Sequence, residues 1–305
     1  MKLNFSGITL GFLAAAFFIT TPAIAQKKPV KKVAALKPAV FVVLNDGKWI
    51  EPIGVVSGGK LGDETEDDSN KVKVFGSRYY KPKTSYPVIF GGAADGSVTV
   101  TKSNIGSECG GASADVTLRS TNFKPTALVM ALASNVKLKP GGISYRRRPT
   151  TAERTKIDDL VRSEFTKNGA SASAVKSLHF YNVTAVDVDG DGVPEFIGSY
   201  WIAPTANERR LLFFVAEQKG ADDLHFGYSE HAIVKPDDIM SGDLKDLEGG
   251  RGSELLIDLL DYDGDGVREI FTIGQAFEGN NYYVYKRDKG KWTRVYETYN
   301  YRCAY

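Results

Sequence analysis

Asp187-Val-Asp-Gly-Asp-Gly-Val-Pro-Glu195 and Asp261-Tyr-Asp-Gly-Asp-Gly-Val-Arg-Glu269 are two copies of one nine-residue pattern. Each copy follows an apolar run, at 183–186 or 255–260, and leads into a second apolar run, at 196–197 or 270–273. Two apolar runs separated by a turn that contains Asp-Gly are typical of a β-hairpin. The repeated string therefore predicts two hairpins within a chain that is mainly β, with antiparallel sheets.

The spacing of the acidic residues indicates a metal site. Carboxylates at positions one, three and five of a tight turn converge on one point, glycine at position six allows the chain to reverse, and position seven offers its backbone carbonyl. Acidic groups this close together repel one another, and Ca²⁺ suits them better than Mg²⁺ because its oxygen coordination is flexible. We therefore expect two structural Ca²⁺ ions, with the ligands Asp187, Asp189, Asp191, the Val193 carbonyl and Glu195 in the first loop, and Asp261, Asp263, Asp265, the Val267 carbonyl and Glu269 in the second.

Two other interpretations of the loops are weaker. An EF-hand requires a bidentate Glu at position twelve and flanking helices, whereas Gly198 and Thr272 stand at that position and strands are expected on both sides. Asp-Gly pairs also form plain hairpin turns. Both copies retain every carboxylate, which favours calcium binding over a simple turn.

The loops resemble those of the FG-GAP/VCBS repeat class, which occurs in integrin-like and bacterial extracellular β-propellers. The resemblance covers roughly residues 178–300 and implies the same calcium ligands, with each loop joining the first strands of a propeller-blade-like β-meander. Two later strand pairs with polar turns, 211–216 with 224–228 and 282–285 with 292–296, extend this pattern. An N-terminal hairpin, 41–44 with 49–53 around Asn45-Asp-Gly-Lys48, could complete or flank these sheets.

Other segments predict further strands and one helix. Residues 72–75, 88–90 and 98–101 are expected to be strands, and 126–133 is ambiguous between a strand and a short helix. A helix is predicted near 151–168, because Thr150 and Glu153 have capping-box spacing and an apolar stripe follows. That stripe consists of Ile157, Leu160, Val161 and Phe165, and Asn168-Gly169 should end the helix.

The N-terminus predicts export. Residues 1–25 have a positive start, an apolar run and Ala23-Ile24-Ala25, the layout of a cleavable signal peptide, so the protein is expected to be secreted or periplasmic. We expect a Lys/Pro-rich leader at 26–38, an N-terminal β region at 39–140 and the calcium-loop region at 141–305. Cys109 and Cys303 are the only cysteines and are expected to form a disulfide in this oxidising compartment, with two separately buried thiols as the alternative.

Composition and motifs limit the function. The net charge of +2 argues against a nucleic-acid partner, and no later segment is apolar enough to cross a membrane. Three hypotheses are an exported binding or scaffold module with a protein or glycan ligand, a secreted hydrolase with structural calcium, and a glycan-binding envelope or adhesion component. No catalytic residue is predicted, since no hydrolase motif is present.

Three residue clusters have both a functional and a structural interpretation. The acidic run at 63–68 could bind a cation and Arg146-Arg147-Arg148 could bind an anion, but exposed loops explain both. The C-terminal aromatic residues could form a carbohydrate platform. Strand alternation places Tyr282 on one face and Tyr283 and Tyr285 on the other, which favours packing.

Overall fold

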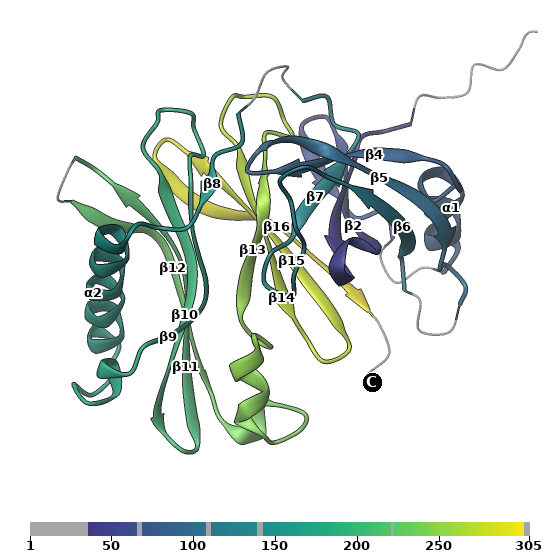
Figure 1. Cartoon of the computed structure of the whole chain (residues 1–305). Helices are drawn as coiled ribbons and strands as arrows, with labels where there is room; N and C mark the ends of the chain where they lie inside the picture. Colours follow the sequence, from purple (N-terminus) through teal and green to yellow (C-terminus); the bar gives the residue numbers. More distant parts are fainter. Residues whose placement is uncertain (1–35, 66–68, 108–110, 139–142, 221–222, 302–305) are drawn as a thin grey trace, which may run out of the picture. The chain divides into compact units, whose positions relative to one another are not determined.

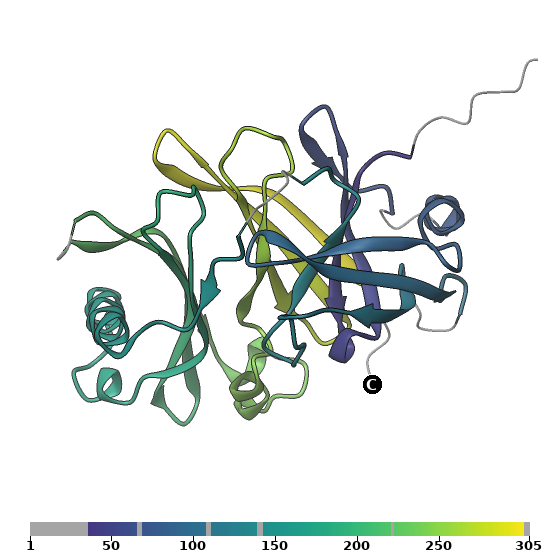
Figure 2. The ribbon, with the colours of Figure 1, turned by 45° about the horizontal axis from the view of Figure 1, so that its top comes forward.

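The computed structural model describes residues 36–65, 69–107, 111–138, 143–220 and 223–301. The strands of this part of the chain form three antiparallel sheets, as Figures 1 and 2 show. The chain is therefore mainly β, as predicted. The predicted signal peptide, most of the predicted leader, Cys109 and Cys303 lie outside the described residues.

The first sheet closes into a barrel. Its strands follow the order β1-β7-β4-β5-β6-β2-β3, and β1 also pairs with β2, so six of them form a closed ring with β3 at its side. Closure leaves few unpaired strand edges. The bounds are β1 (Ala39–Leu44), β2 (Trp49–Ser57), β3 (Lys60–Gly62), β4 (Ser85–Phe90), β5 (Ala93–Ser103), β6 (Ala114–Arg119) and β7 (Ala131–Ser134).

The predicted N-terminal hairpin is confirmed, with Leu44 opposite Trp49. It belongs to the barrel, and β2 contacts the last strand of the C-terminal sheet, so the hairpin flanks that sheet and does not complete it. The turn is a short 3₁₀ segment, Asn45–Gly47, whose three residues have φ of 49°, 53° and 80°. The ambiguous stretch 126–133 contains a bridge between Thr126 and Val129 and the first residues of β7.

The expected strand at 72–75 is wrong, because this segment lies in helix α1 (Ser69–Tyr79). Val72 and Val74 alternate with lysines as in a strand, but the buried residues are Phe75 and Tyr79, one helical turn apart. Both rings lie 6.2 Å from the ring of Phe41 on β1, so helix α1 packs against the interior of the barrel. Burial of these large aromatic rings outweighs the strand propensity of the valines.

The second sheet has five strands in the order β12-β11-β10-β9-β8. They are β8 (Arg146–Arg147), β9 (His179–Val186), β10 (Glu195–Thr205), β11 (Glu208–Gln218) and β12 (Leu224–Val234). Helix α2 (Thr151–Lys167) covers one face (Figure 1) and buries Ile157, Val161 and Phe165 there. The predicted capping box is present: Thr150 accepts from Glu153 N, and the Glu153 carboxylate accepts from Thr150 N.

The third sheet is a four-stranded meander, β13 (Glu254–Leu260), β14 (Glu269–Gln275), β15 (Gly279–Asp288) and β16 (Lys291–Tyr301). One of its faces packs on the five-stranded sheet and the other packs on the barrel. Tyr282 belongs to the barrel-side core and Tyr285 to the opposite core, and Tyr283 packs beside Tyr285, so the predicted alternation is confirmed. Packing explains these three rings.

A buried ion pair connects the three sheets. Asp258 on β13 is inaccessible to solvent, and Arg146 of β8 is 6% exposed, with 2.8 Å between Arg146 Nη1 and Asp258 Oδ2. The same carboxylate accepts hydrogen bonds from Gly91 N and Gly92 N in the β4–β5 turn of the barrel, both at 2.9 Å. Arg146 is therefore not part of an exposed basic loop.

Candidate metal centre

The two Asp-rich loops occupy equivalent places in the second and third sheets. The first joins β9 to β10, and the second joins β13 to β14, the first strands of the four-stranded meander. Glu195 pairs with Val186, and Glu269 pairs with Leu260, so the acidic residue at position nine starts the returning strand in both hairpins. This is the hairpin arrangement that the apolar runs predicted.

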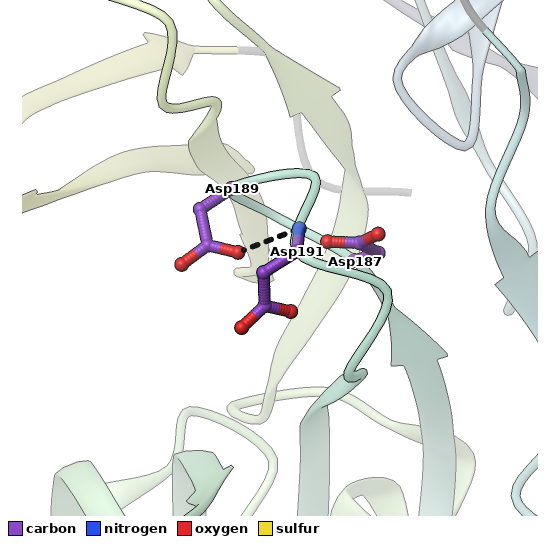
Figure 3. A group of neighbouring side chains, drawn as sticks. All are labelled: Asp187, Asp189 and Asp191. Atoms are coloured by element: carbon purple, nitrogen blue, oxygen red, sulfur yellow. Dashed lines mark hydrogen bonds between the residues drawn. The ribbon is translucent and has the colours of Figure 1, made fainter.

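The first loop is held by hydrogen bonds to its own carboxylates. Gly190 N and Gly192 N donate to the two oxygens of Asp187, at 2.7 and 3.0 Å. Three further bonds run from Asp191 N to Asp189 (3.3 Å), from Val193 N to Asp191 (2.7 Å) and from Val188 N to Glu195 (2.9 Å). Figure 3 shows the three aspartates and the bond between Asp189 and Asp191.

The second loop repeats every one of these bonds. Gly264 N and Gly266 N donate to Asp261 at 2.8 and 3.1 Å. The remaining bonds run from Asp265 N to Asp263 (3.2 Å), from Val267 N to Asp265 (2.9 Å) and from Tyr262 N to Glu269 (3.2 Å). Equivalent residues in two stretches that lie far apart in the sequence thus adopt one loop conformation.

The glycines explain why the pattern requires their positions. Gly190 and Gly192 have φ of 81° and 85°, and Gly264 and Gly266 have φ of 84° and 102°. Only glycine enters this region without steric cost, and it does so twice within three residues. The tight reversal brings the three carboxylates of each loop close together.

Each aspartate triad brings its oxygens together. In Asp187, Asp189 and Asp191, and likewise in Asp261, Asp263 and Asp265, one carboxylate oxygen per residue lies within 4.8 Å of the others. These are the two such groups among the described residues. The donor atoms are all oxygen, so either triad could hold a hard divalent cation.

The glutamates at position nine are buried beside the aspartates. Glu195 is 6% exposed and Glu269 is 1% exposed. Burial, reinforced by the negative charge of Asp189, raises the pKa of Glu195 to about 7. Burial and the charge of Asp263 raise the pKa of Glu269 to about 7 as well. Both shifts arise mainly from burial and secondly from a neighbouring carboxylate charge, and a bound cation would offset both costs.

Two adjacent basic residues of β15 reach the loops. The Lys286 ammonium contacts Asp263, Asp265 and Glu269, so it neutralises part of the second cluster. Arg287 reaches the other loop, with Nη1 2.8 Å from Asp189 Oδ2. Nothing in the local sequence around these residues indicated either contact, since each depends on the pairing of β15 with β14 and on the packing of the two sheets.

Arg268, at position eight of the second loop, joins the two loops directly. Its backbone N–H donates to Val188 O at 3.1 Å, and its Nη1 donates to Asp187 O at 2.8 Å. The first loop has Pro194 at the corresponding position. Proline has neither a backbone N–H nor a side-chain donor, so it cannot make the equivalent bonds to the second loop. Arg268 therefore connects the two candidate metal centres by two hydrogen bonds.

Other candidate residues have structural partners. In the described part of the acidic run, Asp63 accepts from Thr298 at 2.6 Å, and Glu64 pairs with Lys37 at 3.0 Å. The Val193 N–H donates to Asp191, and the Val267 N–H donates to Asp265. That the carbonyls of these two valines are calcium ligands stays a prediction.

Comparisons with family models, with curated proteins and with solved structures found no match. No helix in the described ranges is long and apolar enough to cross a membrane.

Proposed function

We propose that this chain is an exported calcium-binding β-repeat protein that acts as a binding or scaffold module for a protein or a glycan. Each loop would hold one structural Ca²⁺, and the two meander sheets would be blade-type repeats of the FG-GAP/VCBS class. The observation that carries the proposal is the duplication of five loop hydrogen bonds at the same place in two sheets.

The position of the loops supports a structural role for the ion. Each loop joins two strands that pack in one shared core. Val186, Val188, Ile197, Leu259 and Ile270 belong to that core. A cation held by the first loop would fix the ends of β9 and β10, and one held by the second would fix β13 and β14. Because Arg268 bonds to the first loop, ordering of one loop would also favour the ordered form of the other.

Calcium titration by calorimetry tests the proposal. We expect two sites, with Kd near the value of about 10⁻⁴–10⁻³ M found in extracellular calcium modules. Calcium at tenfold excess over Kd would stabilise the fold by about 1.4 kcal/mol per site. Mg²⁺ should bind more weakly, because its strict octahedral geometry suits this ligand set poorly.

Matched substitutions assign the sites. Asp187→Asn and Asp261→Asn should each remove one calcium equivalent, while Asp237→Asn, an exposed aspartate in the 3₁₀ turn Pro236–Asp238, should leave both. An unchanged melting temperature in EDTA, together with no saturable heat of calcium binding, would refute the proposal.

A further inference from the structure

A cavity whose lining includes no residue of the two Asp-rich loops has a volume of about 640 Å³. Three parts of the chain enclose it: the segment 126–129 with Phe90 of the barrel, the stretch 146–149 that includes β8, and residues 180–184 of β9. Arg154 in the first turn of α2 completes the wall. The volume lies within the range of about 300–1,000 Å³ typical of small-molecule sites.

The charged residues that line this cavity are all positive. They are Arg146, Arg147, Arg148 and Arg154, and no Asp or Glu stands among the lining residues. Asp258, Glu153 and Asp158, which pair with three of these arginines, are not among the lining residues. Within the described ranges the unpaired positive charge at the wall is that of Arg148, and a concave surface focuses such a field on whatever enters it.

Three of the guanidinium groups are held in place by those carboxylates. Arg146 Nη1 pairs with Asp258, and Arg147 makes two bonds of 2.7 Å to Glu153. Arg154 Nε donates to Asp158 at 2.8 Å. These contacts fix the side chains before any ligand arrives, which lowers the entropic cost of binding.

Arg148 differs from the other three. Its side chain is exposed and has no carboxylate partner in the described ranges. A guanidinium group with free donors is well suited to a carboxylate or phosphate, which it can bind with two parallel hydrogen bonds. Arg148 is therefore the group best placed to pair with an incoming anion.

The remaining wall is apolar and aromatic. Phe180 is 50% exposed, and the Arg154 guanidinium carbon lies 3.7 Å from the centroid of its ring. Leu128 and Val129 lie on the barrel side. In the same cavity the Asn182 side-chain oxygen is buried and has no hydrogen-bond donor among the described residues. A ligand with an apolar ring would cover the surface formed by Phe180, Leu128 and Val129.

We propose that this cavity binds a small organic anion, in which a carboxylate or phosphate group pairs with Arg148 and a ring packs against the part of the Phe180 ring that Arg154 leaves exposed. The proposal does not depend on calcium binding, since the cavity contains none of the loop residues.

Calorimetry with four probes tests it: 4-hydroxybenzoate, phenyl phosphate, inorganic phosphate and the neutral 4-hydroxybenzyl alcohol. We expect saturable binding of one or both aromatic anions and weaker binding of the other two probes. Arg148→Gln should lower the affinity at least about tenfold, because a charge-assisted pair is lost. Phe180→Ala should lower it through loss of the ring contact. The stronger of the two aromatic anions identifies the preferred head group.

Arg119→Gln is the control, since Arg119 is exposed on β6 and does not line the cavity. It should bind as the unmodified protein does, and circular dichroism should show that all variants are folded. The proposal is overturned if neither aromatic anion binds saturably, if Arg148→Gln and Arg119→Gln bind equally well, or if the neutral alcohol or inorganic phosphate binds as tightly as the aromatic anions.

Discussion

Replacing Arg146 with Met tests whether one buried ion pair holds the three sheets together. Methionine is close to arginine in length and is apolar, so it fills much of the same space without a charge. The substitution leaves the Asp258 carboxylate, which is inaccessible to solvent, with backbone N–H donors at Gly91, Gly92 and Leu259 but without a counter-ion. It also removes the donor that reaches the carbonyls of Met130 and Ile257.

The expected cost is large. Removing one partner of a buried pair costs about 3–5 kcal/mol, because the remaining charge stays desolvated and uncompensated. For a domain of this size, a loss of 1 kcal/mol lowers Tm by about 2 °C, so Arg146→Met should lower Tm by about 6–10 °C. Asp258→Asn removes the charge and retains a hydrogen-bonding side chain, so in the double variant the lost arginine should cost less than it does alone.

Urea unfolding followed by tryptophan fluorescence measures both effects. A double-mutant cycle of Arg146→Met and Asp258→Asn should give a coupling energy of about 2–3 kcal/mol, at the upper end for residues in direct contact. Arg119→Gln, on the exposed surface of β6, should change stability by no more than about 0.5 kcal/mol. A cost below about 1 kcal/mol for Arg146→Met, or a coupling energy near zero, would refute the idea that this pair connects the sheets.

Four further predictions concern separate parts of the chain. Lys286→Met should raise the calcium affinity of the second loop at least about tenfold, because the Lys286 ammonium group competes with calcium for the same carboxylates. Calorimetry with both loops intact measures this affinity, and an unchanged value would contradict the prediction. Burial raises the pKa of Glu254 from 4.5 to about 7, so the folded state binds this proton more tightly and the free energy of unfolding should fall as pH rises from about 4.5 to 7; Glu254→Gln should flatten that slope in saturating calcium. Thr150→Ala should cost about 1 kcal/mol in urea unfolding through loss of the α2 cap, and no loss would mean that the capping bond contributes nothing. Cys109 and Cys303 are expected to form a disulfide, so thiol titration of denatured, unreduced protein should find no free thiols, and about two per chain would reject the bridge.

The sequence predicted the features that depend on neighbouring residues. The hairpins around the Asp-rich loops, the N-terminal hairpin and the capping box of α2 all follow from patterns within about ten residues. Helix α1 shows where such reasoning fails. Val72 and Val74 alternate with lysines, which is typical of a strand. The segment is a helix because Phe75 and Tyr79, one helical turn apart, both pack into the barrel interior.

Contacts between distant segments could not be predicted from the sequence, for a different reason. Asp258 stands within an apolar strand, where a single acidic residue gives no sign of its partner, and Arg146 lies in a basic triplet that suggests an exposed loop. Burial of either charge becomes tolerable only when β8, β13 and the β4–β5 turn come together, so the pair is a property of the assembled sheets.

The same reasoning applies to the candidate metal centres. The ligand spacing can be read from one loop, but the charge balance of that loop is set by residues from elsewhere: Lys286 for the second loop, and Arg287 and Arg268 for the first. Lys286 contacts three carboxylates of the second cluster. In the first cluster Arg287 contacts the Asp189 carboxylate, and Arg268 bonds to the Asp187 backbone carbonyl. Calcium should therefore fill the first loop at lower concentration than the second, although the two sequences carry the same carboxylates. Stepwise binding in calorimetry, with Asp187→Asn removing the tighter step, would support this order, and loss of the weaker step in that variant would reverse it.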